Sequence, residues 1–367
     1  MRFSIRKSKI ITQTFVTLTL LFSLHIFISL LTKNLRHEEH VIVDPKRIAI
    51  VAINLIKSKN KYIEAEEMNE CYAIQHKYSL ITLYDNRDFD ITYNCKQFDF
   101  SFRRHCILAN FAYRNKNLYD YILFIDSDMG VINPAQKLEK YLPKGKEEII
   151  FYERYFNHEI AAGSFIFKNK DYARHLLHYI ANYEGRLPLT YSCRDNVILH
   201  GAIVEYISSG IYGKEFINCN NFLSDIQNFT TCEIYVACMR WILNKVDENN
   251  NYYDYQSFSN KKIIILKKFS ERRWVRDIWL TKFQFSEADF FLHDLKSEKF
   301  FYNKRFILDE FIFNRDLCEG PDFMDAWKYN KSAVTDTSTI NKKLMEWKNK
   351  ADRNFLKLLN LSNVENV

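Results

Sequence analysis

Three short apolar runs alternate with helical patterns in the first third of the chain, and this order constrains the fold most strongly. The runs are RIAIVAIN (47–54), SLITLYD (79–85) and YILFI (121–125). The first and third are apolar almost throughout, as expected of strands that are covered on both faces of a parallel sheet. Between them, residues 65–72 and 107–112 carry apolar side chains at helical spacing. The alternation predicts an α/β fold with parallel strands joined by right-handed crossovers.

The later part of the chain keeps such patterns up to about residue 300. Apolar runs predict strands at 148–154, 161–169 and 261–268, and polar residues predict a loop at 246–260. Apolar residues at i, i+3, i+4 and i+7 predict helices over 173–180 and from about Asp195 onward. After the alternation lapses, residues 340–358 read as an amphipathic helix that packs on the domain.

Asp126 and Asp128 follow the third apolar run directly, in YDYILFIDSDMGVINP. In an open parallel sheet, ligands bind at the carboxyl ends of the strands, and side chains at i and i+2 of an extended chain share one side. The two carboxylates can therefore share one hard cation, and substrate phosphate oxygens usually complete the shell of a cation held by so few protein ligands. This pattern predicts a metal that bridges the protein and a diphosphate.

Three other interpretations compete with this one. Two acids after a strand can cap the next helix or form a turn. A calcium loop expects further acids and a glycine at set spacing, which MGVINP does not supply. A haloacid-dehalogenase-type phosphatase also places two acids after an apolar strand, but it expects Thr or Val where this chain has Gly130. The two acids alone leave capping and metal binding open, and the sequence context has to decide.

The N-terminal region predicts a membrane anchor. Residues 10–31 are 22 residues without a charge, long enough to span a bilayer, which takes about 20 residues. Basic residues are concentrated before this run, so residues 1–9 are expected to be cytosolic and residues 32–46 to form a lumenal stem. A cleaved signal peptide is the alternative, but the run exceeds the usual apolar core of about 7–15 residues and lacks a small-x-small cleavage site. We expect a single-pass type II protein of the Golgi or endoplasmic reticulum.

Cysteines and sequons fit a lumenal location. The chain has eight Cys, an even number, and Cys219, Cys232 and Cys238 are close enough in sequence for a local disulfide. A zinc site is the alternative, but no C-x2-C pair exists. Sequons at Asn228, Asn330 and Asn360 are compatible with glycosylation. Lys and Arg are scattered, so a net charge of +7 gives no basic block that would indicate a nucleic-acid partner.

Several sequence blocks together carry a resemblance to a known family. They are FRRHC, LFIDSDMGVINP, FYERYFNHEIAAGSFIFKN, CRDN, RRWVRD and FFLHDLK, in that order between Arg47 and Lys296. With the predicted anchor in front, the chain resembles the GT-A glycosyltransferases, which use nucleotide-sugar donors. Within them it is similar to the retaining galactosyltransferase and mannan-synthesis group, and more so to a nematode-expanded family of uncharacterised type II membrane proteins. The resemblance implies a Rossmann-like GT-A domain over 47–300, a nucleotide-diphospho-sugar transferase, followed by a C-terminal extension over 301–367.

The resemblance implies a metal and phosphate site. Asp126 and Asp128 match the D-x-D motif that holds a divalent metal, usually Mn²⁺, on the donor diphosphate, and His293 matches a third ligand. Imidazole suits manganese better than magnesium or calcium. Lys296 corresponds to a lysine that reaches the diphosphate, and Arg103 lies where the family has a basic residue near the donor phosphate.

It also implies donor-binding residues along the sheet edge. Ala52, Asn54 and Tyr62 follow the first strand or lie at its end, where the nucleoside of the UDP-sugar is usually held. Gly163 and Ser164 match a Gly-Ser turn, in which a missing side chain lets the backbone approach the sugar.

The expected catalytic residues are Asp195 and Asn196, which stand where relatives have an Asp-Gln pair beside the reacting sugar carbon. Retaining transfer needs stabilisation of an oxocarbenium-like centre, and a carboxylate or amide can supply it. Two departures from the family are visible. Asn196 replaces Gln and shortens the reach of the amide, and Asp294 follows His293 where many relatives have Gly.

Each assignment has a structural alternative. These alternatives are a satisfied core histidine for His293, a surface charge for Arg103, packing for Tyr62, a helix N-cap for Asp195, and a structural ion pair or acceptor-site role for Arg276 and Asp277.

Taken together, these features predict a type II membrane glycosyltransferase. It would be Mn²⁺-dependent and would transfer a hexose, with galactose as the first candidate, from a UDP-sugar to a glycan or glycoconjugate acceptor with retention. Two alternatives are a catalytically inactive lumenal protein of the same fold that binds glycans or protein partners, and a lumenal phosphatase. Metal-dependent nucleotide binding separates the enzyme from the inactive protein, and phosphate release from monoesters would identify the phosphatase.

Overall fold

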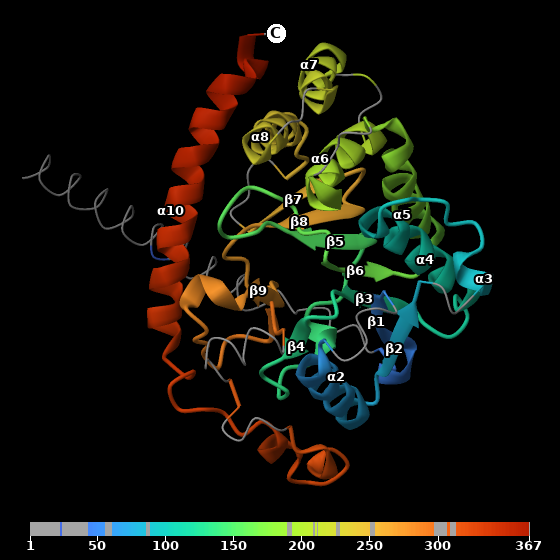
Figure 1. Cartoon of the computed structure of the whole chain (residues 1–367), viewed down its shortest axis with the longest axis vertical. Coiled ribbons are helices and arrows are strands. Elements are labelled where there is room, and N and C mark those ends of the chain that lie inside the picture. Colours follow the sequence, from blue (N-terminus) through green and yellow to red (C-terminus); the bar gives the residue numbers. More distant parts are fainter. Residues whose placement is uncertain are drawn as a thin grey trace, which may run out of the picture. The chain divides into compact units, whose positions relative to one another are not determined.

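Among the described residues, seven strands form a mixed central sheet in the order β2-β1-β3-β6-β5-β8-β7 (Figure 1). The strands are β1 (Ile48–Asn54), β2 (Ser79–Tyr84), β3 (Tyr121–Ile125), β5 (Ile149–Tyr152), β6 (Ser164–Lys168), β7 (Tyr255–Phe258) and β8 (Ile263–Leu266). β1 is parallel to β2 and β3, and β5 is parallel to β8. β6 runs antiparallel to both β3 and β5, and β7 runs antiparallel to β8. The α/β class is confirmed, and so is the parallel pairing of the first three strands, while β6 and β7 add antiparallel pairs to the sheet.

The computed structural model describes most of the chain from residue 43. The described residues are 23, 43–55, 61–85, 89–188, 193–207, 210, 212–224, 228–249, 254–296, 307–308 and 313–366. Within these ranges no helix combines the length and the apolar character that a membrane crossing requires. The predicted anchor, 10–31, lies outside the described residues except for Ser23.

β1 and β3 are buried on both faces because each one supplies two hydrophobic cores, whereas β2 at the edge of the sheet is only partly buried. All seven residues of β1 are buried. Ala49, Val51 and Ile53 belong to one core, and Ile48, Ile50 and Ala52 to the core on the other face. This division follows from the alternation of side chains along a strand.

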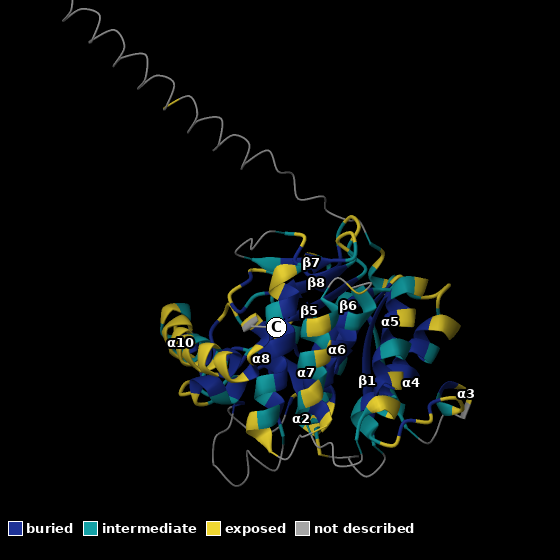
Figure 2. Ribbon diagram, turned by 90° about the horizontal axis from the view of Figure 1, so that it is seen from above, coloured by how far each residue is buried: buried dark blue, intermediate teal, exposed yellow. Residues whose placement is uncertain are grey.

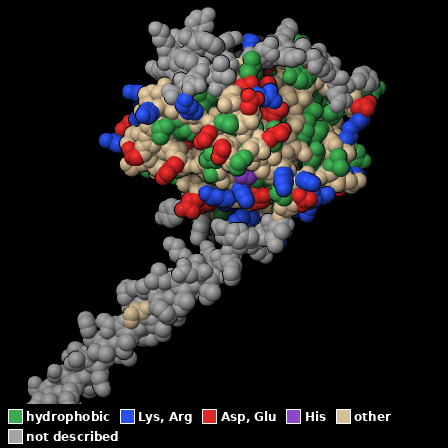
Figure 3. Space-filling view, turned by 90° about the horizontal axis from the view of Figure 1, so that it is seen from below, with side chains coloured by type: hydrophobic (Ala, Val, Ile, Leu, Met, Phe, Trp, Pro, Cys, Tyr) green, Lys and Arg blue, Asp and Glu red, His purple; other side chains and the backbone are tan. Residues whose placement is uncertain are grey.

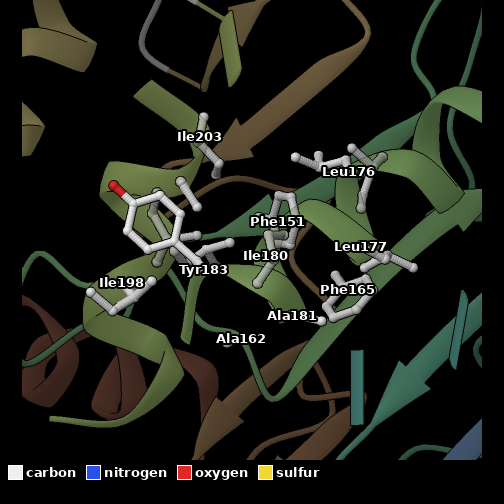
Figure 4. Close-up of a cluster of buried hydrophobic side chains, with 14 of the residues drawn as sticks. Phe151, Ala162, Phe165, Leu176, Leu177, Ile180, Ala181, Tyr183, Ile198 and Ile203 are labelled. Carbon is white, nitrogen blue, oxygen red and sulfur yellow. The ribbon is translucent and has the colours of Figure 1, made fainter. Parts of the chain in front are cut away.

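Helices cover the first face. They are α4 (Phe100–Arg114), α5 (Asp171–Asn182), α6 (Arg194–Ile207), α7 (Gly213–Ser224) and α8 (Phe229–Lys245), with the short α3 (Phe89–Thr92) before them. Figure 4 shows how the core forms here. Leu176, Leu177 and Ile180 of α5 point toward Phe151 of β5 and Phe165 of β6. The spacing of the three helical residues is the i, i+1, i+4 pattern of one buried stripe, so the predicted α5 is confirmed.

The second face carries α2 (Ile63–His76) and a smaller sheet. That sheet has the order β4 (Met129–Val131), β10 (Phe291–His293), β9 (Val275–Asp277). Short 3-10 helices lie at Pro45–Arg47, Leu138–Lys140, Tyr183–Arg186, Ile278–Thr281, Arg315–Leu317, Phe323–Ala326 and Val364–Asn366. β3 ends at Ile125 and β4 begins at Met129, so Asp126 and Asp128 lie in the short connection between the large sheet and the small one.

α10 (Thr337–Ser362) is a long C-terminal helix that packs on the domain. Asp336 caps it by accepting a hydrogen bond from the Thr339 N–H at 2.8 Å. Ile340 and Leu344 are buried against Tyr155 and Leu280, while the outer face of the helix is exposed (Figure 2). The helix is therefore held by one apolar stripe.

Two features of the second half differ from the sequence-based expectation. The loop predicted at 246–260 contains β7, whose four residues, YQSF, are too few and too polar to indicate a strand. β7 exists because its backbone pairs with β8. Helices α7 and α8 were not predicted either.

All eight cysteines form disulfides, and the pairs are Cys71–Cys318, Cys95–Cys106, Cys193–Cys232 and Cys219–Cys238. The local bridge expected among Cys219, Cys232 and Cys238 is Cys219–Cys238, and Cys232 pairs elsewhere. Figure 3 shows acidic and basic side chains interspersed over the face that it presents. This mixture agrees with the absence of a basic block in the sequence.

Candidate functional site

The two acids lie in the turn that connects the large sheet to the small one. The Asp126 N–H donates to the Gly163 carbonyl at 2.7 Å, and the Met129 N–H closes the turn on the Asp126 carbonyl at 3.0 Å. Because β3 ends at residue 125 and β4 begins at 129, both carboxylates are fixed at the carboxyl end of a buried strand. This is the location that the sequence predicted.

His293 reaches the acids through strand pairing. β10 is antiparallel to β4, with His293 opposite Met129. One ligand atom from each of Asp126, Asp128 and His293 can be chosen so that all three atoms lie within 4.8 Å of one another. The His293 Nε2 atom lies 3.2 Å from Asp128 Oδ1. Two carboxylates and one imidazole form a donor set that fits Mn²⁺ or another first-row transition metal, although Asp126 and His293 are 167 residues apart in sequence.

Charge compensation inside this cluster also fits a cation. Burial alone would raise the pKa of Asp128, but His293 and Lys296 outweigh it and hold this pKa well below its usual range. Burial would likewise lower the pKa of His293, yet Asp128 and Asp277 raise it to about 10. The pKa of Asp126 is raised, mainly by burial. In the metal-free protein a protonated imidazole thus provides the positive charge that a metal would provide in its place.

Asp277 and Arg154 form a second layer behind His293. The Nδ1 atom of His293 lies 2.7 Å from Asp277 Oδ1, and Arg154 Nη2 donates to the same carboxylate at 2.9 Å. A carboxylate on the second ring nitrogen orients a metal-binding histidine and fixes its tautomer. The interpretation of Arg276 and Asp277 as one ion pair is wrong. Arg276 pairs with Asp289 on the other side of β9, since adjacent side chains of a strand point to opposite faces.

Arg104 contacts both Asp126, a predicted metal ligand, and Asp195, a predicted catalytic residue. Its guanidinium donates to Asp126 Oδ1, and its Nη2 donates to Asp195 Oδ2 at 2.6 Å. His105 adds a contact from Nε2 to the same Asp195 oxygen at 3.0 Å. These contacts, chiefly with Arg104, lower the pKa of the buried Asp195 to about 2, although burial alone would raise it. Asp195 is therefore ionised and held in a fixed position.

The structure does not bring Arg103 to this cluster. Its guanidinium pairs with Asp85 at 2.7 Å, after the end of β2. Arg104 is the buried one of the two, on the face of α4 that packs against the sheet. The sequence signal was present, because Arg104 continues the apolar stripe of Ile107, Leu108 and Phe111 at i, i+3, i+4 and i+7, whereas Arg103 does not.

Gly163 and Asn196 shape the wall opposite the metal cluster. A Cβ atom on Gly163 would lie 2.2 Å from Asp126 Oδ2, so no other residue fits without moving that carboxylate. Asn196 Oδ1 accepts a hydrogen bond from the Ala162 N–H at 2.8 Å and so fixes the segment before Gly163. Ser164 is fully buried and accepts a hydrogen bond from Trp274 Nε1 at 2.9 Å. Its hydroxyl supports the core rather than the site.

The residues predicted to hold the nucleoside are only partly brought together. Asn54 accepts a hydrogen bond from the Ser127 hydroxyl, between the two acids, and its amide faces Glu66 at 3.3 Å. Ala52 is buried within β1, and Tyr62 directly precedes α2. Residues 56–60, between them in the chain, lie outside the described residues.

Asp294 occupies a backbone conformation that favours glycine. Its φ is +78°, in the left-handed region that glycine adopts most readily, and the sequence resemblance implies a Gly at this position. Its carboxylate pairs with Lys296, whose Nζ lies 3.0 Å from both Asp294 Oδ1 and Asp128 Oδ2. The additional negative charge is thus compensated by the lysine expected to reach the diphosphate.

A cavity of about 20 Å³ lies between these groups, lined by Asp126, Arg154, Gly163, Asn196, Asp277 and His293 among others. Its size suits a single ion, and its lining joins the proposed metal ligands to the proposed catalytic amide. Ionised carboxylates, one imidazole and fixed guanidinium groups can bind a cation and orient an anionic ligand at its edge.

A family model described as "Protein of unknown function, DUF273" matches residues 69–309 of the chain. The match includes every residue of the metal cluster and ends before α10. No curated protein matches the chain.

Several solved structures are similar at low levels. A glycosyltransferase involved in glycosylation of the major capsid of PBCV-1 has 15% identity and a TM-score of 0.34, over 42% of this chain and 74% of that one. GlyE of Streptococcus pneumoniae TIGR4, a glycosyltransferase, has 16% identity and a TM-score of 0.32, over 50% of this chain and 52% of its own. The catalytic domain of Drosophila beta1,4galactosyltransferase 7 has 10% identity and a TM-score of 0.25, over 41% of this chain and 58% of that one. Similarity at these levels does not establish an activity for this chain.

Proposed function

This chain belongs to the DUF273 family of proteins of unknown function, and we propose that it is a metal-dependent glycosyltransferase with a GT-A-like fold. The observation that carries the proposal is the cluster of Asp126, Asp128 and His293 at the carboxyl end of a buried parallel strand. The donor would be a UDP-hexose, with UDP-galactose the first to test, and the acceptor a glycan or glycoconjugate. The sequence resemblance supports retention of anomeric configuration.

The residues have distinct roles in this proposal. Asp126, Asp128 and His293 would hold the metal, which stabilises charge on the departing diphosphate. Asp277 orients His293. Lys296, which pairs with Asp128 and Asp294, would contact a diphosphate oxygen in the donor complex.

Asp195 and Asn196 would face the reacting sugar carbon. Because Arg104 contacts both Asp126 and Asp195, it fixes the spacing between the metal site and the carboxylate that would stabilise positive charge on the sugar. A mutation that moves Arg104 would therefore affect metal binding and chemistry together.

We propose in addition that residues 10–31 anchor the protein in the Golgi or endoplasmic reticulum membrane, with the rest of the chain in the lumen. Four disulfides support an oxidising compartment.

A second candidate is a catalytically inactive lumenal protein that keeps this fold and binds glycans or protein partners. The observation in its favour is Asp294, which places a carboxylate beside the lysine expected to bind the diphosphate. Such a protein would have lost productive donor binding while keeping its core.

Calorimetric titration of UDP into the full-length chain, with and without Mn²⁺, tests the proposal. We expect micromolar binding that requires the metal, and loss of that binding in Asp128→Ala, with circular dichroism showing that the variant is still folded. Asp90→Ala, which removes an exposed acid paired with Arg114, is the control and should bind as the wild type does. No binding by the folded wild type would favour the inactive protein, and unchanged affinity in Asp128→Ala would remove the metal site. Phosphate release from a monoester without a sugar acceptor would indicate a phosphatase instead.

A further inference from the structure

A large cavity lined by described residues lies apart from the metal cluster, on the other side of β9. Its volume is about 630 Å³, within the range of about 300–1,000 Å³ typical of small-molecule sites. Arg276 lines it, whereas Asp277, the next residue of the same strand, lines the metal site. Adjacent side chains of a strand point to opposite faces, so one strand separates the two sites.

Four segments far apart in sequence form this cavity. They are residues 133–141, 269–276, 286–291 and the first turns of α10, from Thr337 to Leu344, and Tyr155 adds a further side chain to the lining. The α10 wall lies beyond residue 309, where the DUF273 match ends. The C-terminal helix, which has no part in the proposed catalytic site, thus completes the cavity. Figure 1 shows α10 running alongside β9.

The charges around the cavity do not favour a phosphate or a polyanion. The lining has four basic side chains, Lys137, Lys140, Arg273 and Arg276, and three acidic ones, Glu271, Glu287 and Asp289, which leaves one excess positive charge. Arg276 is held by both carboxylate oxygens of Asp289, at 2.5 and 2.8 Å. Arg273 is occupied by backbone carbonyls and lies between the rings of Tyr152 and Tyr155, at 4.5 and 4.3 Å. Only the two rim lysines are available, and the exposed Glu271 and Glu287 offset them.

The lining is instead both aromatic and polar. Tyr141, Trp274 and Phe290 lie beneath the floor with at most 2% of each residue exposed, so the accessible aromatic surface is the ring of Phe269 at the rim, which is 37% exposed. Asn341 on α10 adds an exposed amide at the edge. A sugar ring has apolar C–H faces and a rim of hydroxyls that both donate and accept hydrogen bonds, so it matches the exposed Phe269 ring bordered by amides and carboxylates.

We propose that this cavity is a carbohydrate-binding site for a neutral oligosaccharide, separate from the metal site. The proposal goes beyond the proposed glycosyl transfer and does not depend on it. A protein without transferase activity would bind a glycan here equally well, and a transferase would use the cavity to hold a glycan chain away from its reacting end.

The test uses the full-length chain and three neutral probes, chitohexaose, xylohexaose and cellohexaose, with binding followed by saturation-transfer difference NMR and calorimetry. We expect at least one probe to bind, and EDTA and Asp128→Ala to leave its affinity unchanged. Asn341→Trp, which fills the edge of the cavity, and Phe269→Ala, which removes the exposed ring, should each weaken binding at least about tenfold. Met345→Trp, on the exposed face of α10, is the matched control and should bind as the wild type does.

Several outcomes would overturn the assignment. They are no binding of any probe by a folded protein, binding that EDTA or Asp128→Ala abolishes, and binding that Asn341→Trp and Phe269→Ala leave intact. Binding of heparin but of no neutral probe would also overturn it. The failure of UDP to bind would not, so the two proposals fail separately.

Discussion

At the scale of single residues, the candidate site depends on groups that hold the metal ligands in place. Gly163 is the tightest case, because a Cβ atom there would lie 2.2 Å from an Asp126 oxygen. Gly163→Ala should therefore displace Asp126, weaken Mn²⁺ binding about tenfold or more, and cost about 1–3 kcal/mol of stability as an overpacked substitution. Calorimetry and chemical denaturation measure both effects. Gly185→Ala, where a Cβ would meet nothing within 4 Å, should change neither quantity.

Asp277 offers a second test at this scale. Asp277→Asn keeps the shape of the side chain but removes the charge that orients His293 and raises its pKa. We expect Mn²⁺ affinity to fall roughly 10–100-fold, as for other outer-layer carboxylates. Asp289→Asn, which alters the acid paired with Arg276 on the opposite side of β9, is the control. Equal affinity of wild type and Asp277→Asn would show that His293 is not a ligand.

At the scale of elements, α6 is joined to the segment before β6 by a buried neutral histidine. His200 Nε2 accepts from the Ile160 N–H at 3.0 Å, while Nδ1 faces the Asn196 carbonyl at 3.0 Å. Burial, with Arg240 nearby, lowers the pKa of His200 to about 3. In the unfolded chain the pKa of His200 is about 6.5, so the unfolded state takes up a proton at a higher pH than the folded state does. The neutral His200 therefore stabilises the folded state fully above that pH, and this stabilisation is lost as the pH falls toward 3.

This linkage predicts a pH-dependent stability. Between pH 6.5 and 5, His200 should contribute a loss of about 2 kcal/mol in the free energy of unfolding, at about 1.4 kcal/mol per pH unit. Denaturant unfolding of wild type and His200→Gln at both pH values isolates this contribution. Parallel pH dependence of the two proteins would contradict a neutral buried His200.

α10 provides the second prediction for an element. Leu344 is 3% exposed and packs with Ile340 against Tyr155 and Leu280, whereas its neighbour Met345 is 43% exposed. Leu344→Ala should cost about 2–5 kcal/mol of unfolding free energy, and Met345→Ala less than about 0.5 kcal/mol. Similar small losses for both would mean that α10 is not an integral part of the domain.

For the whole molecule, one disulfide joins distant parts of the chain. Cys71 in α2 is bonded to Cys318 across 247 residues, whereas Cys95 and Cys106 are 11 residues apart. In the chain-entropy description, the longer loop restricts the unfolded state more, by about 5 against about 3 kcal/mol. Cys71→Ala with Cys318→Ala should therefore destabilise the protein more than Cys95→Ala with Cys106→Ala. Thermal unfolding of the two double variants compares them, and the reverse order would contradict this account.

The sequence by itself determined much of the first half of the fold. Continuous apolar runs mark β1 and β3 because strands buried on both faces cannot carry polar residues, and the i, i+3, i+4 stripes mark α4 and α5. The two acids after β3 were likewise readable, since their position follows from where the strand ends. These are local patterns, and local patterns are visible in one dimension.

Tertiary structure decided the rest. The choice of Arg104 over Arg103 and the contact of Asp277 with His293 rather than with Arg276 depend on contacts between residues 22 and 16 positions apart. The existence of β7 depends on its backbone pairing with β8, which its own polar sequence does not indicate. The disulfide partners and the cavity beneath α10 have the same origin. Spacing along the chain limits which side chains share a face, but only packing of distant segments decides which of them touch.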